Sequence, residues 1–170
     1  RVSKIVQDLR TFSRLHESEI KDVDISETIS STLELARYEL NKRDIDVRLE
    51  LSDLPIVECY PSELNQVFLN LIINAAQAME NGGKLEILGR SENGNITLEF
   101  ADTGVGIPEA IMNKIFDPFF STKPVGDGTG LGLSISYKII TEKHKGSISV
   151  RSKINEGSVF TIVIPERLKK

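Results

Sequence analysis

Apolar residues return every three or four positions in several stretches of the chain, which is the period of a helix with one buried face. The stretches predicted to be helical are 25–41, 61–79 and 130–144, with a short helix over 109–114. Asp24 and Glu27 resemble a capping box at the start of the first helix. Pro61 suits the first turn of the second helix, and Asn81-Gly82-Gly83 should end it.

Alternation of apolar and polar residues predicts strands elsewhere. The expected strands are 45–51, 56–60, 84–90, 95–101, 147–152 and 157–164, with turns at Glu92-Asn93-Gly94 and Asn155-Glu156-Gly157. We expect 56–60 to be the sheet neighbour of 45–51. Because helices and antiparallel hairpins come in separate blocks, the pattern predicts an α+β fold. This would be a two-layer α/β sandwich, with a mixed, mostly antiparallel sheet packed on about three helices.

The first 15 residues carry a pattern of their own. Apolar Val2, Ile5, Leu9 and Phe12 recur at helical spacing, as in a bundle-type helix that precedes the sandwich. This helix is either the end of a helical hairpin or a helix folded back on its own domain. Residues 16–24 are polar and indicate a linker, so we expect the main domain to occupy 25–170.

Composition narrows the class of protein. A chain of 170 residues has the length of one ordinary domain, or of one domain with a stub of another. A net charge of -4 argues against binding nucleic acid by bulk charge. No run of about 18 apolar residues occurs, so no membrane-spanning segment is expected. The single cysteine, Cys59, excludes an internal disulfide and fits a reducing compartment.

Two asparagines on the second predicted helix are the first candidate for chemistry. Asn70 and Asn74 are four residues apart, which places them on one face of an otherwise apolar helix. An amide oxygen is a suitable ligand for Mg²⁺, which binds few protein groups. Taken alone, the two residues could equally be ordinary polar positions.

The turn Asp102-Thr103-Gly104-Val105-Gly106 follows directly on a predicted strand. The carboxylate of Asp102 could accept a hydrogen bond from an exocyclic amine such as N6 of adenine. Gly104 and Gly106 would let the backbone approach a flat ligand or turn with positive φ. The alternative is a plain Asp-Thr-Gly turn.

A third and a fourth motif lie close together. Phe116-Asp117-Pro118-Phe119-Phe120-Ser121-Thr122-Lys123 places three phenylalanines and a lysine in a loop, and Lys123 could reach a phosphate. A hydrophobic patch beside a surface lysine would look the same. Gly128-Thr129-Gly130-Leu131-Gly132-Leu133 opens a helix, where backbone N–H groups can bind an anion. It is neither a P-loop nor a dinucleotide G-x-G-x-x-G motif.

In this order the four motifs resemble the N, G1, F and G2 boxes of the ATP-binding catalytic domain of sensor histidine kinases. The wider GHKL superfamily includes DNA gyrase, the mismatch-repair ATPase and a heat-shock chaperone. The resemblance covers about residues 24–165. It implies ATP and Mg²⁺ as cofactors.

The resemblance also implies roles for individual residues. Asn74 and Asn70 would bind Mg²⁺, and Asn74 and Lys123 would act in catalysis. Asp102 would bind adenine N6, with Thr161 helping through water. Gln77 stands where many relatives have a basic residue, whose phosphate contact Lys123 could supply. The implied cofactor-binding residues are Asn70, Asn74, Gln77, Ala78, Asp102, Gly104, Gly106, Ile107, Lys123, Gly128, Thr129, Gly130, Leu131, Gly132, Leu133 and Thr161.

The implied activity is that of a protein-histidine kinase, which transfers the γ-phosphate of ATP to a histidine on another segment. A response-regulator aspartate would then receive the phosphoryl group. Residues 1–15 resemble the second helix of the hairpin through which such kinases dimerise, and His144 is expected to be structural. We expect a cytoplasmic location, whether or not the parent kinase is anchored in a membrane. A GHKL-type ATPase that uses Glu63, a serine kinase module and a non-enzymatic nucleotide-binding module remain alternatives.

Overall fold

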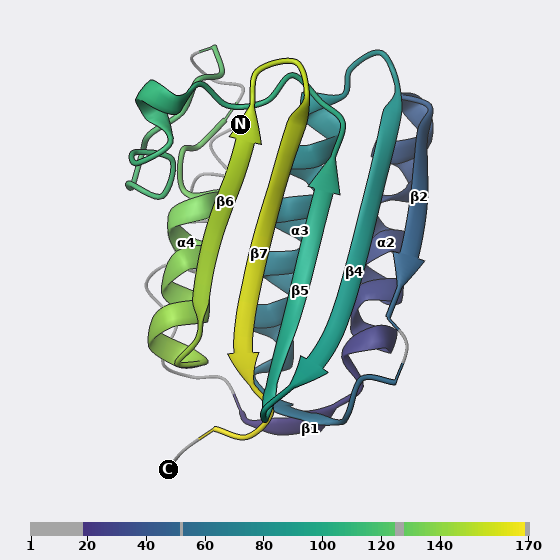
Figure 1. Ribbon diagram of the computed structural model, residues 1–170, viewed down its shortest axis with the longest axis vertical. Coiled ribbons are helices and arrows are strands. Elements are labelled where there is room, and N and C mark those ends of the chain that lie inside the picture. The colour runs from purple at the N-terminus through teal and green to yellow at the C-terminus, as the bar shows by residue number, and fades with distance from the viewer. Residues whose placement is uncertain (1–18, 52, 125–127, 169–170) are drawn as a thin grey trace.

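One five-stranded sheet forms the front layer of the molecule in the computed structural model, which describes residues 19–51, 53–124 and 128–168 (Figure 1). The strands, in spatial order, are β2 (Ile45–Glu50), β4 (Gly83–Glu92), β5 (Asn95–Asp102), β7 (Gly157–Pro165) and β6 (Ser147–Lys153). Only the β2–β4 pair is parallel within this sheet. The predicted mixed, mostly antiparallel sheet is therefore confirmed.

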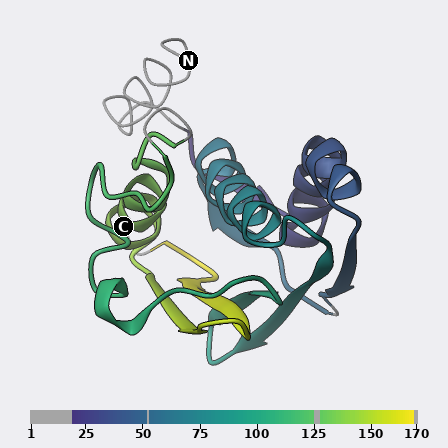
Figure 2. The same cartoon turned by 90° about the horizontal axis from the view of Figure 1, so that it is seen from above.

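The helices cover one face of this sheet, as the view from above shows (Figure 2). They are α2 (Ile25–Lys42), α3 (Pro61–Ala78) and α4 (Gly132–Lys138). The last is continued by a π-helix, η2 (Ile139–Lys143), while the short helix expected over 109–114 is a 3₁₀ turn, η1 (Glu109–Ile111). The predicted two-layer α+β sandwich is confirmed, and the helix expected over 1–15 lies outside the described residues.

The central helix α3 packs its apolar face against the middle of the sheet. Phe68 of α3 stacks on Phe100 of β5 with ring centroids 5.8 Å apart. Along β5 the inward-facing residues are Ile96, Leu98, Phe100 and Asp102, because side chains alternate between the faces of a strand. The same alternation that builds the core thus carries the Asp102 carboxyl into the helix layer.

The strand expected over 56–60 does not pair with its predecessor, so that prediction is wrong. Val57–Cys59 (β3) pairs antiparallel with Lys21–Val23 (β1) in a separate two-stranded sheet. β1 also lies inside the segment expected to be a linker, 16–24. The partner of β2 is β4, and α3 connects the two, because a parallel pair needs a crossover rather than a tight turn.

The start of α2 follows the sequence expectation. The Asp24 carboxylate accepts hydrogen bonds from the backbone amides of Ser26 (2.8 Å) and Glu27 (3.4 Å). These amides belong to the first turn, where no helical carbonyl is available to them. Asp24 is therefore the N-cap that the sequence predicts.

Candidate nucleotide-binding site

The predicted site residues come from segments that meet at one end of the helix layer. The turn after β5 contacts the last turn of α3, because the Val105 amide donates to the Ala78 carbonyl over 3.1 Å. Asn70 of α3 contacts the first residue of α4, Gly132. Segments that are distant in sequence are therefore joined around α3.

Asp102 is the buried carboxyl of this site, with 8% of its surface exposed. The Gly104 amide donates to its Oδ1 over 2.8 Å, and the Ser158 backbone also hydrogen-bonds to this side chain. Burial raises the pKa of Asp102, and the two backbone hydrogen bonds act in the opposite direction. A carboxyl held in this way presents a strong acceptor to a donor from a ligand.

Glycine is required in the turn after Asp102 because the chain packs against itself there. A Cβ atom on Gly104 would lie 2.5 Å from the carbonyl oxygen of Ala78. Gly106 has a φ of +74°, and a Cβ there would overlap the carbonyl of Lys153. The Ile107 amide donates to the Ser152 hydroxyl over 2.7 Å. The turn is therefore held between α3 and the β6–β7 hairpin.

Asn70 ties α3 to α4. Its Nδ2 donates to the Gly132 carbonyl over 3.1 Å and to the Ser136 hydroxyl over 3.3 Å. Because the amide nitrogen is the donor, the amide oxygen is the atom through which Asn70 can bind a cation. Asn74 is half-buried one turn further along the same helix face.

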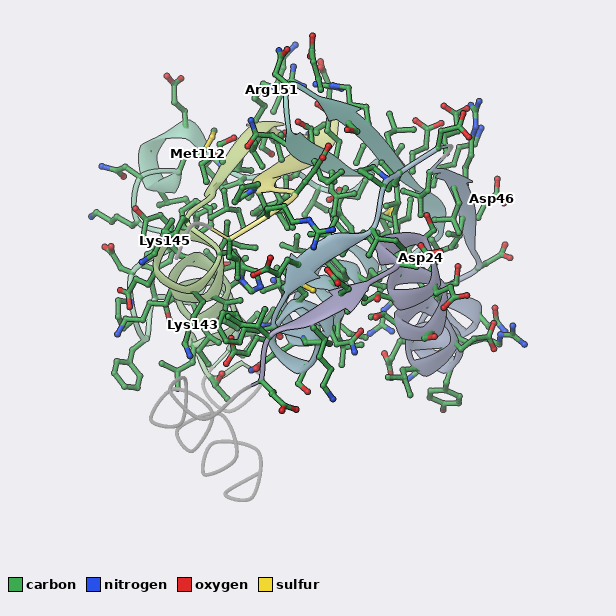
Figure 3. All side chains as sticks on the ribbon, turned by 90° about the horizontal axis from the view of Figure 1, so that it is seen from below. Asp24, Asp46, Met112, Lys143, Lys145 and Arg151 are labelled. Atoms are coloured by element: carbon green, nitrogen blue, oxygen red, sulfur yellow. The ribbon has the colours of Figure 1, made fainter. Side chains whose placement is uncertain are left out.

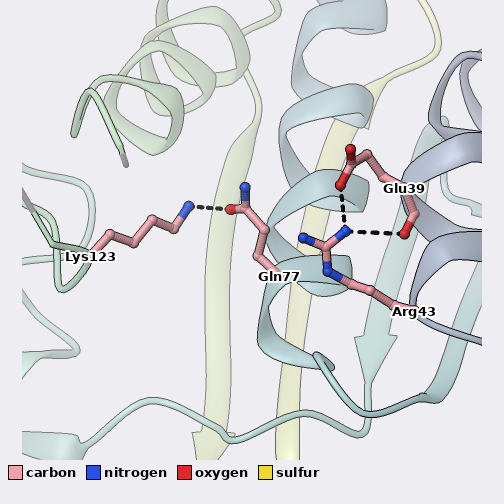
Figure 4. Close-up of polar contacts among 4 residues, drawn as sticks. All are labelled: Glu39, Arg43, Gln77 and Lys123. Carbon is pink, nitrogen blue, oxygen red and sulfur yellow. Dashed lines mark hydrogen bonds and ion pairs between the residues drawn. The ribbon is translucent and has the colours of Figure 1, made fainter. Parts of the chain in front are cut away.

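Lys123 reaches across to the last turn of α3, where its Nζ donates to Oε1 of Gln77 (Figure 4). Gln77 follows Asn74 by three residues, so the ammonium group lies near the candidate metal ligands. A Cβ on Gly128 would lie 3.0 Å from the side chain of Lys123, which places the fourth motif beside this lysine. The structure thus brings Gln77, Lys123 and Gly128 together.

The glycine-rich segment before α4, residues 128–131, packs against the aromatic loop, residues 116–123. The Phe119 amide donates to the Gly130 carbonyl over 2.9 Å. Gly130 has a φ of +68°, and a Cβ there would lie 2.5 Å from the carbonyl carbon of Phe119. The Leu131 amide donates to the Thr129 hydroxyl over 3.3 Å, and Leu131 is buried while Leu133 is half-buried.

Thr161 is not brought to Asp102. It pairs with Glu99 in the middle of β7, on the opposite face of the sheet from its neighbours Phe160 and Ile162. The residue paired with Asp102 is Ser158, which is 5% exposed. The sequence could have indicated Ser158, because it is the polar member of the inward-facing row of β7 and directly follows Gly157.

Glu63, the candidate water-activating residue of an ATPase, lies at the other end of α3. Glu63 forms an ion pair with Lys143 over 3.7 Å, and the Lys143 ammonium lies 4.8 Å from the centre of the Tyr60 ring. Figure 3 shows Lys143 beside the end of the last helical segment. Glu63 precedes Asn74 by eleven residues. This separation is about 16 Å along a helix, so Glu63 is far from Asn74.

His144 is buried at the same end, with 1% of its surface exposed. The Tyr60 amide donates to its Nε2 over 3.1 Å, and its Nδ1 lies 2.8 Å from the Ile139 carbonyl. Nε2 must therefore be unprotonated and Nδ1 must carry the proton, so the ring is neutral. Burial lowers the pKa of His144.

The described part of the chain contains neither a metal-binding cluster of ionisable side chains nor a membrane-spanning helix. There, no three histidine, cysteine, aspartate or glutamate side chains gather into a group that could hold a metal ion. Within the same residues, no helix combines the length and the apolar character needed to cross a membrane.

The sheet order and the motifs grouped around α3 define the class of this domain, which is a GHKL ATP-binding module. The chain belongs to the family described as histidine kinase-, DNA gyrase B-, and HSP90-like ATPases, whose profile matches residues 59–168. Within that family it is similar to sensor histidine kinases.

Among curated relatives, the sensor histidine kinase ZraS of Escherichia coli is 32% identical over the whole chain, and sporulation kinase E of Bacillus subtilis is 31% identical over 98% of it. The chain spans only 36% and 22% of the length of these two relatives.

Solved structures agree with this assignment. The catalytic domain of the histidine kinase ThkA is 35% identical, with a TM-score of 0.79 over 88% of this chain and 97% of that domain. A second structure holds ThkA in complex with the response regulator protein TrrA, with 31% identity and a TM-score of 0.81 over 98% of this chain and 47% of ThkA.

Proposed function

We propose that this chain is the ATP-binding catalytic domain of a two-component sensor histidine kinase. It would bind ATP so that the γ-phosphoryl group moves to an imidazole nitrogen of a histidine on another segment, with ADP as the leaving group. The observation that carries this proposal is the buried Asp102 carboxyl beside a glycine turn clamped onto α3. The similarity to histidine kinases supports the choice of acceptor.

Adenine recognition rests on Asp102 in this proposal. Its carboxylate would accept a hydrogen bond from the N6 amine, while Ala78, Gly106 and Ile107 would line the base. The contact between Ala78 and the turn after Asp102 supports this grouping, because the two segments pack directly on each other. Ser158, and not Thr161, is then the side chain next to the carboxylate.

Phosphate and metal binding would use the other half of the site. The oxygens of Asn74 and Asn70 fit Mg²⁺, since a neutral amide oxygen is a hard ligand and this ion retains several non-protein ligands. The ion would neutralise charge on the phosphates. Lys123, held by Gln77, would move its ammonium to the phosphates, and backbone amides of the segment from Gly128 to Leu133 would donate to them.

The rest of the parent protein is inferred from the relatives. We propose that residues 1–15 end a dimerising helical hairpin, that 16–24 form the connection and that 25–170 form the catalytic domain, although β1 belongs to the fold of the latter. A response-regulator receiver domain is the proposed partner, as in the ThkA–TrrA complex. A cytoplasmic location is proposed on the same basis.

A clamp-type ATPase is the second candidate function, but the position of Glu63 does not favour it. Such an enzyme needs a glutamate that activates water beside the γ-phosphate. Glu63 is paired with Lys143 at the opposite end of α3 from Gln77 and Lys123. The charge of Glu63 therefore serves the packing of α3 against the segment after α4.

Nucleotide binding by an Asp102→Asn variant tests the proposed pocket. Asparagine keeps the shape but loses the charge-assisted acceptor, so we expect the affinity for ADP, measured by calorimetry, to fall about 100-fold. Asp46→Asn is the control, since Asp46 is exposed on β2. An Asp102→Asn variant with unchanged affinity would contradict the pocket, and absence of phosphotransfer to a separate histidine hairpin would contradict the kinase assignment.

A further inference from the structure

Three polar residues form a row across neighbouring strands beside the proposed adenine pocket. Asp102 of β5 pairs with Ser158 of β7, and Ser158 pairs with Ser152 of β6. Residues paired across a sheet share a face, so all three side chains lie on one side of it. Asp102 and Ser158 are buried and Ser152 is half-buried.

The Ser152 hydroxyl makes three hydrogen-bond contacts in this row. It accepts from the Ile107 amide over 2.7 Å, and it lies 2.9 Å from the Gly157 carbonyl and 2.7 Å from the Ser158 hydroxyl. A hydroxyl has one hydrogen and two lone pairs. With the Ile107 amide on one lone pair, Ser152 can donate to Gly157 and accept from Ser158, which uses its full capacity.

Two further contacts between the turn after Asp102 and the β6–β7 hairpin are made by backbone atoms. The Asn155 amide donates to the Val105 carbonyl over 2.8 Å, and Gly106 lies against the Lys153 carbonyl. The Ser152 side chain is thus a side-chain link from the hairpin to Ile107 at the far end of the turn. It is also the neighbour that orients the Ser158 hydroxyl beside Asp102.

We propose that Ser152 is a positioning residue for adenine recognition: its hydroxyl fixes the backbone of Ile107 and the Ser158 hydroxyl, and thereby the shape of the pocket around Asp102. Ser152 does not itself touch the base in this proposal. The proposal rests on the proposed function, because it assigns Ser152 to the nucleotide pocket of that function.

The test compares the affinities of Ser152→Ala, Ser152→Thr and the unchanged chain for ADP and for IDP, in which an oxygen replaces the 6-amino group. We expect Ser152→Ala to bind ADP about tenfold more weakly, because the part-buried Ile107 amide loses its acceptor. The loss for IDP should be smaller, so the preference for ADP over IDP falls. Ser152→Thr keeps the hydroxyl and should restore both values, and Ser149→Ala, exposed on the same strand, should match the unchanged chain.

Hydrogen exchange at the Ile107 amide, followed by NMR without nucleotide, keeps the test independent of binding. We expect exchange to become faster in Ser152→Ala and to stay slow in Ser152→Thr. An unchanged ADP affinity, an equal loss for ADP and IDP, or unchanged Ile107 exchange would each overturn the proposal. If the unchanged chain failed to bind ADP, the proposed function would fall and this proposal with it, whereas failure confined to the Ser152 variants leaves the proposed function standing.

Discussion

At the scale of single residues, burial shifts the Asp102 carboxyl and the His144 ring toward their neutral forms. Burial raises the pKa of Asp102 and lowers that of His144, since desolvation penalises whichever form is charged. Asp102 lies in the proposed pocket, where it can still accept a hydrogen bond from a ligand. His144 has both ring nitrogens in hydrogen-bond contact with protein groups. Burial therefore shifts the pKa of a proposed binding group, Asp102, and that of a structural group, His144.

The raised pKa of Asp102 predicts a pH dependence of adenine binding. Adenosine, which has no titrating phosphate, should bind more weakly as the pH falls and the carboxylate gains a proton. In the folded protein the pKa of Asp102 lies above its ordinary value of 3.8. The loss of adenosine affinity should therefore begin at a higher pH than it would with an exposed aspartate. Fluorescence titrations across pH measure this, and Asp102→Asn should show no such step. A step of equal size in that variant would assign it to another group.

Two glycines with nearly the same φ allow a matched comparison. Gly106 has a φ of +74° and Gly94 one of +75°, but a Cβ on Gly106 would overlap the Lys153 carbonyl while one on Gly94 meets nothing within 4 Å. We expect Gly94→Ala to lower the unfolding free energy by about 1 kcal/mol, from φ strain alone. Gly106→Ala should cost about 2–4 kcal/mol and weaken ADP binding. Equal losses in urea titrations would show that the packing of this turn is unimportant.

At the scale of elements, α3 has different partners at its two ends. Its last turn contacts the turn after β5 and, through Gln77, the loop that carries Lys123. Its first turn is joined to the segment after α4 by the His144 ring and the Lys143–Glu63 ion pair. Residues for nucleotide binding therefore gather at one end of α3, and those that fix its packing gather at the other.

The His144 junction predicts a loss of stability in mild acid. In the unfolded chain His144 has a pKa of about 6.5, and in the folded chain its pKa is lower. The stabilising contribution is therefore complete above pH 6.5 and is lost as the pH falls toward the folded value. Urea titrations should show this step in the unchanged chain. His144→Asn should lack it and be about 2–3 kcal/mol less stable at pH 7, because buried hydrogen bonds are lost.

The contact between Lys123 of the aromatic loop and Gln77 of α3 predicts that Lys123 affects the binding of phosphate-bearing ligands only. Lys123→Ala should weaken ATP binding about tenfold, since an ammonium–phosphate contact is charge-assisted, and should leave adenosine binding nearly unchanged. Lys114→Ala, at an exposed lysine before the aromatic loop, is the control. An equal loss for ATP and adenosine would mean that Lys123 supports the pocket wall and does not contact phosphate.

At the scale of the whole molecule, the proposed donor site and the acceptor belong to different segments. His144 is 1% exposed, so it cannot present a nitrogen to the γ-phosphate without unfolding its surroundings. Incubation of this chain with Mg²⁺ and γ-labelled ATP should therefore give no phosphohistidine at His144. Addition of a separate histidine-bearing hairpin of this kinase class should give acid-labile label on that hairpin alone. Label at His144 would contradict the arrangement.

Much of the fold follows from local patterns. The period of α2 and α3, the cap at Asp24 and the two antiparallel hairpins are all readable because they depend on neighbours a few residues away. The pairing of β3 with β1 cannot be predicted from local pattern, because both strands are three residues long and they lie far apart in the sequence. Likewise, residues such as Asp102 and Gly104 carry motif signals, whereas Ser152 is one serine among many until its pairing is known.

Spacing, residue type and glycine placement by themselves determined the fold class, the four motifs and their order along the chain. Only the tertiary structure decided that Ser158 and not Thr161 faces Asp102, because the register of β5 with β7 is set by long-range pairing. It also decided that Glu63 belongs to the Lys143 junction and that Lys123 rests on Gln77. A motif names which chemical groups are present, whereas distance and face depend on how remote strands and helices pack.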